Sequence, residues 1–140
     1  MAIIQSQCTI FKTNLLKGLE NFNTSTPYVY KIALYTANAN LNADSLIYSV
    51  DGEVAGTGYT AGGKTLVPTV PSSSGNTAFI SFADVSWNPA SFTCRGALIY
   101  NGTTGAAVAV LDFGADKQAI NAFTVTFPAP SSTTAVIRIS

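Results

Sequence analysis

Residues 28–36, Tyr28-Val-Tyr-Lys-Ile-Ala-Leu-Tyr-Thr36, decide the fold because large apolar side chains recur there at every second position. Tyr30, Ile32 and Leu34 fall on one face of an extended chain, since successive side chains of a strand point to opposite faces. Aromatic and β-branched residues in this pattern are typical of a pleated, half-buried surface. The stretch therefore predicts a β-strand.

Six later segments have the same character and are separated by turn-forming residues. They are residues 64–70, 77–82, 91–100, 106–113, 122–127 and 134–139. Clusters of Ser, Gly, Asn and Pro at 72–76, 101–105 and 128–132 predict the turns. Short strands with a turn about every ten residues predict an all-β fold, an antiparallel β-sandwich or jelly roll.

The N-terminal residues follow a different period. Their apolar side chains recur at intervals of three or four, which predicts an amphipathic α-helix. These side chains are Ile4, Cys8, Phe11, Leu15, Leu19 and Phe22. With Ser6 as the N-cap and Gly18 as the C-terminal stop, the helix should span about residues 7–17. A helix this short is marginal alone in water, so it either covers one end of the sheet or reaches a neighbouring subunit. If it is such an arm, deleting residues 1–18 should weaken association more than it lowers the melting temperature.

The chain has 140 residues, enough for one hydrophobic core, and no repeat or linker divides it. We expect a single domain over 1–140, with a helical arm at 1–22 and a β-sandwich at 27–140. Residues 37–63 interrupt the strand pattern with a long run of small side chains. Loops of this length are usually functional or mobile, and we expect the same here.

Charged residues make up only 10% of the chain, seven of each sign, against about 25% in an average soluble domain. Nucleic-acid binding depends on clustered Lys and Arg, so we expect no nucleic-acid partner. A neutral, weakly charged chain also lacks the repulsion that keeps free proteins apart, which favours self-association as a dimer or larger oligomer. No apolar run approaches the ~20 residues that span a bilayer, so we expect no membrane partner. The N-terminus has no secretory signal pattern, which favours folding in the cytoplasm where the chain is made.

One stretch matches a nucleotide-binding motif, Gly58-Tyr-Thr-Ala-Gly-Gly-Lys-Thr65, which has the spacing of a phosphate-binding P-loop. A P-loop needs a helix to begin at its Lys-Thr pair, and the two prolines in residues 66–71 exclude one. The chain contains no histidine and no cluster of metal-ligand type. Asp112 and Asp116 form a carboxylate pair that could serve glycoside hydrolysis or calcium binding, but we interpret them as solvated turn residues that bracket a β-hairpin. The sequence thus predicts no enzyme, no cofactor and no metal.

The remaining residues of interest are two cysteines and a few aromatics. Cys8 and Cys94 could form one disulfide, but buried thiols are the favoured interpretation. Tyr48 and Tyr59 flank the glycine-rich segment, and Trp87 lies at a strand end; these three could anchor an interface or stack on sugars. The candidate interface residues are these three aromatics together with two residues of the helix, Phe11 and Leu15.

Several stretches, in one order over nearly the whole chain, resemble the small virion proteins of tailed bacteriophages. They are Phe11-Lys-Thr-Asn-Leu-Leu-Lys-Gly18, Tyr30-Lys-Ile-Ala-Leu-Tyr-Thr36, Glu53-Val-Ala-Gly-Thr-Gly-Tyr-Thr-Ala-Gly-Gly63, Arg95-Gly-Ala-Leu-Ile-Tyr-Asn101, Ala107-Val-Ala-Val-Leu-Asp-Phe-Gly114 and Ala135-Val-Ile-Arg-Ile139. Within that group the chain is most similar to capsid cement (decoration) proteins, of the kind carried by a short-tailed Bordetella phage.

This resemblance implies a jelly-roll subunit on the outer surface of the virion head. It implies that the partner is the major capsid protein, whose subunit contacts the cement protein bridges and stabilises. The resemblance brings no residue-level motif with it. The alternative is a tail or fibre module that uses the same sandwich to bind a receptor or sugar.

Overall fold

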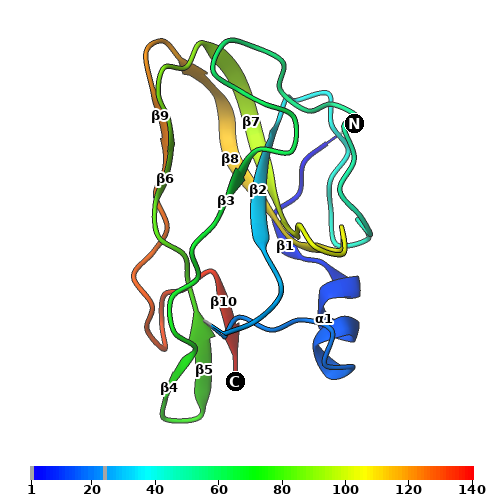
Figure 1. Ribbon diagram of the computed structural model, residues 1–140, viewed down its shortest axis with the longest axis vertical. Coiled ribbons are helices and arrows are strands. Elements are labelled where there is room, and N and C mark those ends of the chain that lie inside the picture. The colour runs from blue at the N-terminus through cyan, green and yellow to red at the C-terminus, as the bar shows by residue number, and fades with distance from the viewer. Residues whose placement is uncertain (1, 24) are drawn as a thin grey trace.

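The computed structural model describes residues 2–23 and 25–140, which form mainly antiparallel β-strands with one short α-helix (Figure 1). The largest sheet has five strands in the order β1–β8–β7–β2–β3. Their bounds are β1 Ser6–Gln7, β2 Tyr30–Tyr35, β3 Lys64–Thr65, β7 Phe92–Asn101 and β8 Ala107–Ala119. The predicted all-β class is therefore confirmed.

Two smaller antiparallel sheets accompany the large one: a three-stranded sheet in the order β10–β5–β4, and the pair β6–β9. Their bounds are β4 Ser72–Ser74, β5 Thr77–Ile80, β6 Val85–Trp87, β9 Phe123–Val125 and β10 Ile137–Ile139. Figure 1 shows β6 and β9 at the left of the large sheet, on the side opposite α1, and β4, β5 and β10 below the large sheet. Aromatic rings join the layers: the ring centroid of Phe92 in β7 lies 5.7 Å from that of Phe123 in β9.

The central strands are buried on both faces. Ile32, Ala33 and Leu34 are consecutive in β2, and all three have 0% of their surface exposed. Consecutive side chains point to opposite faces, so both faces of β2 must be covered. The strand that the sequence predicts as half-buried is thus covered on both faces. Phe22 stacks on Tyr30 on one face, and on the other the hydroxyl of Tyr35 donates to the carbonyl of Ser49 in the 37–63 segment.

The β7–β8 hairpin forms where the sequence predicts a turn. The side-chain Oδ1 of Asn101 accepts hydrogen bonds from the backbone N–H groups of Thr103 and Thr104, at 2.9 and 3.2 Å. Strands β7 and β2 then pair in register, with Ile99 opposite Ile32. An Asn side chain that bonds the backbone two or three residues on is a local turn signal, so this hairpin could be predicted without tertiary information.

Three short strands lie where the sequence predicts none. Strand β1 precedes the helix, β4 occupies part of the predicted turn at 72–76, and β6 falls between two predicted strands. At 72–76 the turn itself needs only Gly75 and Asn76, since Ser74 already pairs with Thr77. Conversely, the predicted strand at 64–70 is reduced to Lys64–Thr65, and Pro68 makes only an isolated bridge to Phe82.

The interpretation of Asp112 and Asp116 as residues around a hairpin turn is wrong, because both lie within strand β8. The register shifts between the pairs Cys94–Lys117 and Gly96–Asp112, because residues 113–116 of β8 lie opposite the single residue Arg95 of β7. Gly114 takes a φ of +83° in this irregular stretch, and glycine adopts this angle without strain.

The helix α1 spans Thr9–Leu16, shorter than the predicted 7–17. Ser6 is not its N-cap: Ser6 and Gln7 pair with Val110 and Ala109 of β8 instead, and the N-cap is Cys8. The predicted stop at Gly18 is confirmed. Gly18 has a φ of +74°, and the N–H of Leu19 bonds the carbonyl of Asn14 at 2.8 Å, which closes the last turn.

The 37–63 segment is not a free loop. The N–H of Val54 donates to the carbonyl of Leu34 at 3.0 Å, and the N–H of Tyr48 donates to that of Gly105 at 2.9 Å. These bonds attach the segment to strand β2 and to the β7–β8 turn. The middle of the segment is therefore held against the sheet by backbone hydrogen bonds. This arrangement does not support the expected mobility of the whole segment.

Candidate interaction surfaces

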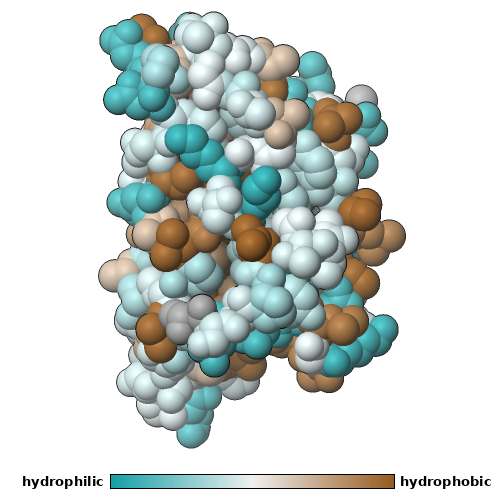
Figure 2. Space-filling view, in the orientation of Figure 1, coloured by the Kyte–Doolittle hydropathy of each residue, from teal (hydrophilic) through white to brown (hydrophobic). Residues whose placement is uncertain are grey.

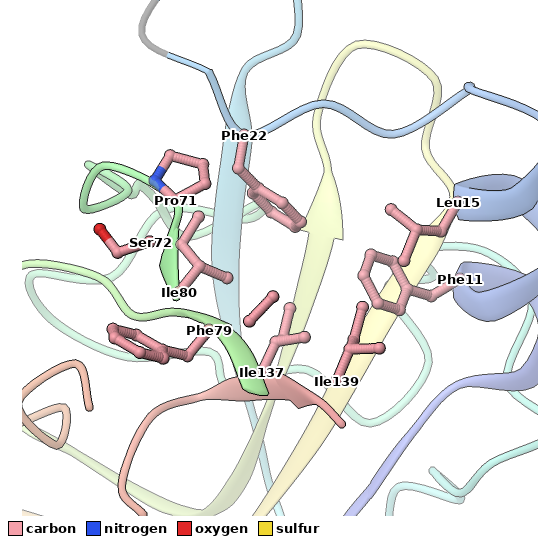
Figure 3. Close-up of a pocket in the computed structure, with 10 residues that line it drawn as sticks. Phe11, Leu15, Phe22, Pro71, Ser72, Phe79, Ile80, Ile137 and Ile139 are labelled. Carbon is pink, nitrogen blue, oxygen red and sulfur yellow. The ribbon is translucent and has the colours of Figure 1, made fainter. Parts of the chain in front are cut away.

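An apolar pocket lies between α1 and the β10–β5–β4 sheet. Its volume is about 120 Å³. Figure 3 shows side chains from α1, from the segment after it and from β10 converging on this space. The lining residues are Phe11, Leu15, Phe22, Pro71, Ser72, Ala78, Phe79, Ile80, Ile137 and Ile139. Only Ser72 among them has a polar side chain, so the pocket suits an apolar occupant.

Exposed apolar side chains lie around the pocket, and a neighbouring hollow that shares Phe11, Leu15 and Ile139 with it also contains Lys12 and Arg138. Ile139 at its edge is 51% exposed, and Leu19 just after the helix is 47% exposed. Residues 65–83, which supply β4, β5 and their flanks, contain no charged side chain. Figure 2 shows apolar and hydrophilic residues side by side at the lower right of the molecule, where Figure 1 places α1. Exposed apolar side chains around an apolar pocket are typical of an interaction site.

The inner face of α1 belongs to the core of its own chain. Phe11 is 1% exposed and packs on Phe22 with ring centroids 5.9 Å apart, and Cys8 is fully buried. Leu15 is partly buried and lines the pocket. Of the two predicted interface residues in the helix, Leu15 therefore lies at the pocket and Phe11 lies beneath it. Deleting residues 1–18 would uncover this core, so point substitutions on the outer face of α1 are the cleaner test of association.

The outer face of α1 points to solvent. Leu16 is 90% exposed; the exposed Lys12 lies one turn before it on the same face of the helix, and the exposed Lys17 follows it as the C-cap residue. The described residues form one ion pair, between Arg95 and Asp112, so neither lysine takes part in one. The outer face thus presents an apolar side chain between two unpaired positive charges.

An open groove runs along the first half of the 37–63 segment, with a volume of about 700 Å³. Its lining includes the exposed apolar side chains of Leu46 and Ile47, at 63% and 61% exposure. Asp44 and Asp51 also line it, and no Lys or Arg does. We call this feature, lined by Tyr35, residues 38–41, residues 44–47, Ser49, Asp51 and Gly52, the acidic groove.

Tyr48 and Tyr59, two predicted interface residues, are joined through one carboxylate. Glu53 accepts hydrogen bonds from the hydroxyl of Tyr48 at 2.6 Å, from the hydroxyl of Tyr59, and from the N–H of Gly62 at 2.8 Å. The hydroxyl of Tyr59 in turn accepts from the N–H of Leu34 in β2, at 2.9 Å. Glu53 therefore holds the glycine-rich segment against the sheet, a role that nothing in the sequence pattern indicates.

The surroundings of these tyrosines keep their hydroxyls protonated. Burial, followed by the hydrogen bond to Glu53, raises the pKa of Tyr59 far above its ordinary value. The same two causes raise the pKa of Tyr48. Both side chains are thus hydrogen-bond donors at any physiological pH, which suits a structural role in the fold.

Trp87, the fifth predicted interface residue, is a core residue with 1% of its surface exposed. Its ring stacks on Tyr59 with centroids 6.1 Å apart, and the Lys64 ammonium lies 5.8 Å from its centroid. A ring so completely covered presents no face on which a sugar could stack.

Glu20 is a further buried group that the sequence pattern did not single out. It is 5% exposed; its Oε1 accepts hydrogen bonds from the hydroxyl of Tyr30 at 2.9 Å and from Nδ2 of Asn101 at 3.0 Å. Its Oε2 is buried without a hydrogen-bond partner. Burial raises the pKa of this carboxyl, and the hydrogen bonds from Asn101 and Tyr30 oppose the shift. The group fastens the segment after α1 to strands β2 and β7.

The P-loop spacing has no P-loop geometry. Lys64 and Thr65 form strand β3 and pair with Ile32 and Lys31 of β2, and the Lys64 ammonium donates to the carbonyl of Ser86 at 2.5 Å. Within the described residues, no group of three or more His, Cys, Asp or Glu side chains is placed to hold a metal ion. Cys8 and Cys94 are both free and buried.

Comparison of the chain with protein-family models, with curated proteins and with solved structures finds no match. In the part of the chain that the structure describes, no helix is long and apolar enough to cross a membrane.

Proposed function

We propose that this chain is a capsid cement protein, which binds the outer surface of an assembled phage head and stabilises contacts between major capsid proteins. The observation behind the proposal is the apolar pocket between α1 and β10–β5–β4, whose lining residues are all uncharged. In this proposal an apolar side chain of the major capsid protein occupies the pocket. The resemblance of the sequence to decoration proteins supports the same partner.

The physical chemistry of the chain suits this role. A protein that binds only the assembled lattice stabilises that lattice by mass action. Each contact can be modest, because many copies on a symmetric shell act together. Extended apolar surfaces with few charges serve such binding better than a cleft lined with reactive groups. The low charge content and the exposed apolar residues near the pocket fit that requirement.

We further propose that the three sheets together make a sandwich of the jelly-roll type. Support comes from ring contacts between layers, such as Phe92 with Phe123, and from the antiparallel pairing of all ten strands. The strands are divided five, three and two among the sheets, so the smaller two would form the second layer together.

The alternative, a tail or fibre module that binds sugar, loses its best candidate residue. Sugar recognition by stacking needs an exposed aromatic face, and Trp87 is 1% exposed. Tyr48 stacks on Tyr100 with centroids 4.7 Å apart, so its ring already has a partner. No feature of the described residues favours that alternative over a capsid partner.

The proposal is tested by co-sedimentation with expanded phage heads assembled without this protein. Wild-type protein should bind saturably, and Ile139→Lys, which places a charge at the edge of the pocket, should weaken binding by about tenfold or more. Ile120→Lys is the matched control, since Ile120 is 72% exposed and lies outside the pocket lining. Equal binding by both variants would show that the pocket is not the contact.

A further inference from the structure

We propose that two copies of this chain associate through the outer face of α1 and the acidic groove, with the helix of each copy lying on the groove of the other. The inference is separate from head binding and concerns the protein free in solution. A second copy of the chain occupies the acidic groove, because the outer face of α1 and the groove are complementary in charge and in apolar content.

The charges match across the proposed contact. The outer face of α1 contributes Lys12 and Lys17, and the groove contributes Asp44 and Asp51. All four side chains are exposed, and none of them is in the ion pair that the described residues form. Opposite charges on two surfaces of one molecule favour contact between copies and fix its orientation.

The apolar side chains match as well. Leu16 projects from α1 with 90% of its surface exposed, and Leu46 and Ile47 line the groove with more than half of theirs exposed. Moving such side chains out of water is favourable in proportion to the apolar surface that becomes buried. The exposed Leu16 with its two lysines, and the acidic groove with its exposed Leu46 and Ile47, are the two halves of this contact.

The placement of the two surfaces allows the contact to form twice. The N–H of Thr9 at the start of α1 donates to the carbonyl of Ala43 at 2.9 Å, so the helix and the groove are neighbours. Figure 1 shows α1 and the 37–50 segment on the same side of the molecule. A twofold axis between two copies would then bring each helix to the partner's groove, which closes the pair.

Charge-reversal variants test this contact. Wild-type protein, K12E/K17E and D44K/D51K would each be measured by sedimentation equilibrium across a concentration series. We expect wild type to associate, and each variant alone to associate at least about tenfold more weakly, because reversal replaces attraction with repulsion. An equimolar mixture of the two variants should associate again, since each helix then meets a groove of opposite charge.

A neutral variant and a salt series complete the test. Leu16→Ser should also weaken association, whereas Ile120→Ser should leave it unchanged. Raising the salt concentration should weaken the mixed pair as it does wild type. Wild-type protein that stays monomeric throughout the series, or variants that associate as wild type does, would overturn the inference. Neither result bears on co-sedimentation with heads, which is measured separately.

Discussion

The hydroxyl of Tyr48 lies 2.6 Å from Oε1 of Glu53, and the other oxygen of the same carboxylate holds Tyr59. Three donors therefore converge on one side chain, two tyrosine hydroxyls and the N–H of Gly62. Through Tyr59, which accepts from the N–H of Leu34, the carboxylate connects the glycine-rich segment to the central sheet. The segment keeps its place through these polar contacts as well as through packing.

Replacing Glu53 by Gln should therefore destabilise the fold. The amide removes the negative charge that strengthens the three hydrogen bonds, and its NH₂ group opposes one of the donors. We expect the free energy of unfolding to fall by about 2 kcal/mol. Urea denaturation followed by tryptophan fluorescence measures it, because Trp87 packs on Tyr59. Asp116→Asn, at an exposed carboxylate of β8, is the control, and an equal loss there would contradict the role assigned to Glu53.

Gly63 should be irreplaceable for a steric reason. It has a φ of +76°, and a Cβ built on it would lie 1.7 Å from the carbonyl oxygen of Ile32. Gly75 has a φ of +60°, but a Cβ there meets nothing within 4 Å. We expect Gly75→Ala to cost about 1–2 kcal/mol from backbone strain alone. Gly63→Ala should cost clearly more, or prevent folding. Thermal melts of the two variants compare them, and equal losses would refute the close approach.

Glu20 should make stability depend on pH. Its pKa is raised above the ordinary 4.5 by burial, so the folded state binds the proton more tightly than the unfolded state. Below pH 4.5 both states are protonated and the stabilising effect of the proton is fully present. As the pH rises through the folded-state pKa, this contribution is lost and stability falls.

Glu20→Gln removes that titration. The difference in unfolding free energy between the variant and wild type should shift in favour of the variant as the pH rises from about 4.5 towards neutrality. Urea titrations at a series of pH values measure this difference. A difference that stays constant over the range would mean that the Glu20 carboxyl has the same pKa in both states.

The two cysteines should be unreactive in the native protein. Burial is the largest cause that raises the pKa of Cys8 to about 11 and that of Cys94 to about 12, and only the thiolate reacts with disulfide reagents. A thiol-reactive dye should label neither cysteine in buffer and both in urea. Rapid labelling of native protein, or a melting temperature that drops with reductant, would contradict the free, buried state.

The parts of the fold that could be predicted are those set by local chemistry. The β7–β8 turn follows from the Asn101 side chain, which accepts a hydrogen bond from the backbone two residues on. The end of α1 follows from Gly18, because glycine adopts a left-handed φ without strain. The start of α1 could not be predicted, because the pairing of Ser6 and Gln7 with β8 competes with helix formation. That competition involves residues about a hundred positions apart, and periodicity does not report it.

The candidate interface residues also divide into those that the sequence pattern predicts and those that depend on the folded structure. Leu15 was identified from the helical period, and the structure places it at the apolar pocket. The same period also selects Phe11. A large aromatic such as Trp87 suits a core and an interface equally well. The sequence alone therefore does not predict that both side chains are buried. Nothing in the sequence pattern indicates the roles of Glu53 and Glu20. The donors to Glu53 lie five to nine residues away in the chain and meet it only once the segment is folded, and one donor to Glu20, Asn101, is 81 residues away.

Binding to the capsid is measured by mixing the purified protein with phage heads that lack it, in unexpanded and expanded forms, and sedimenting the heads. We expect saturable binding to the expanded heads alone, at a fixed ratio to the major capsid protein. Binding to neither form would mean that this chain is not a capsid cement protein.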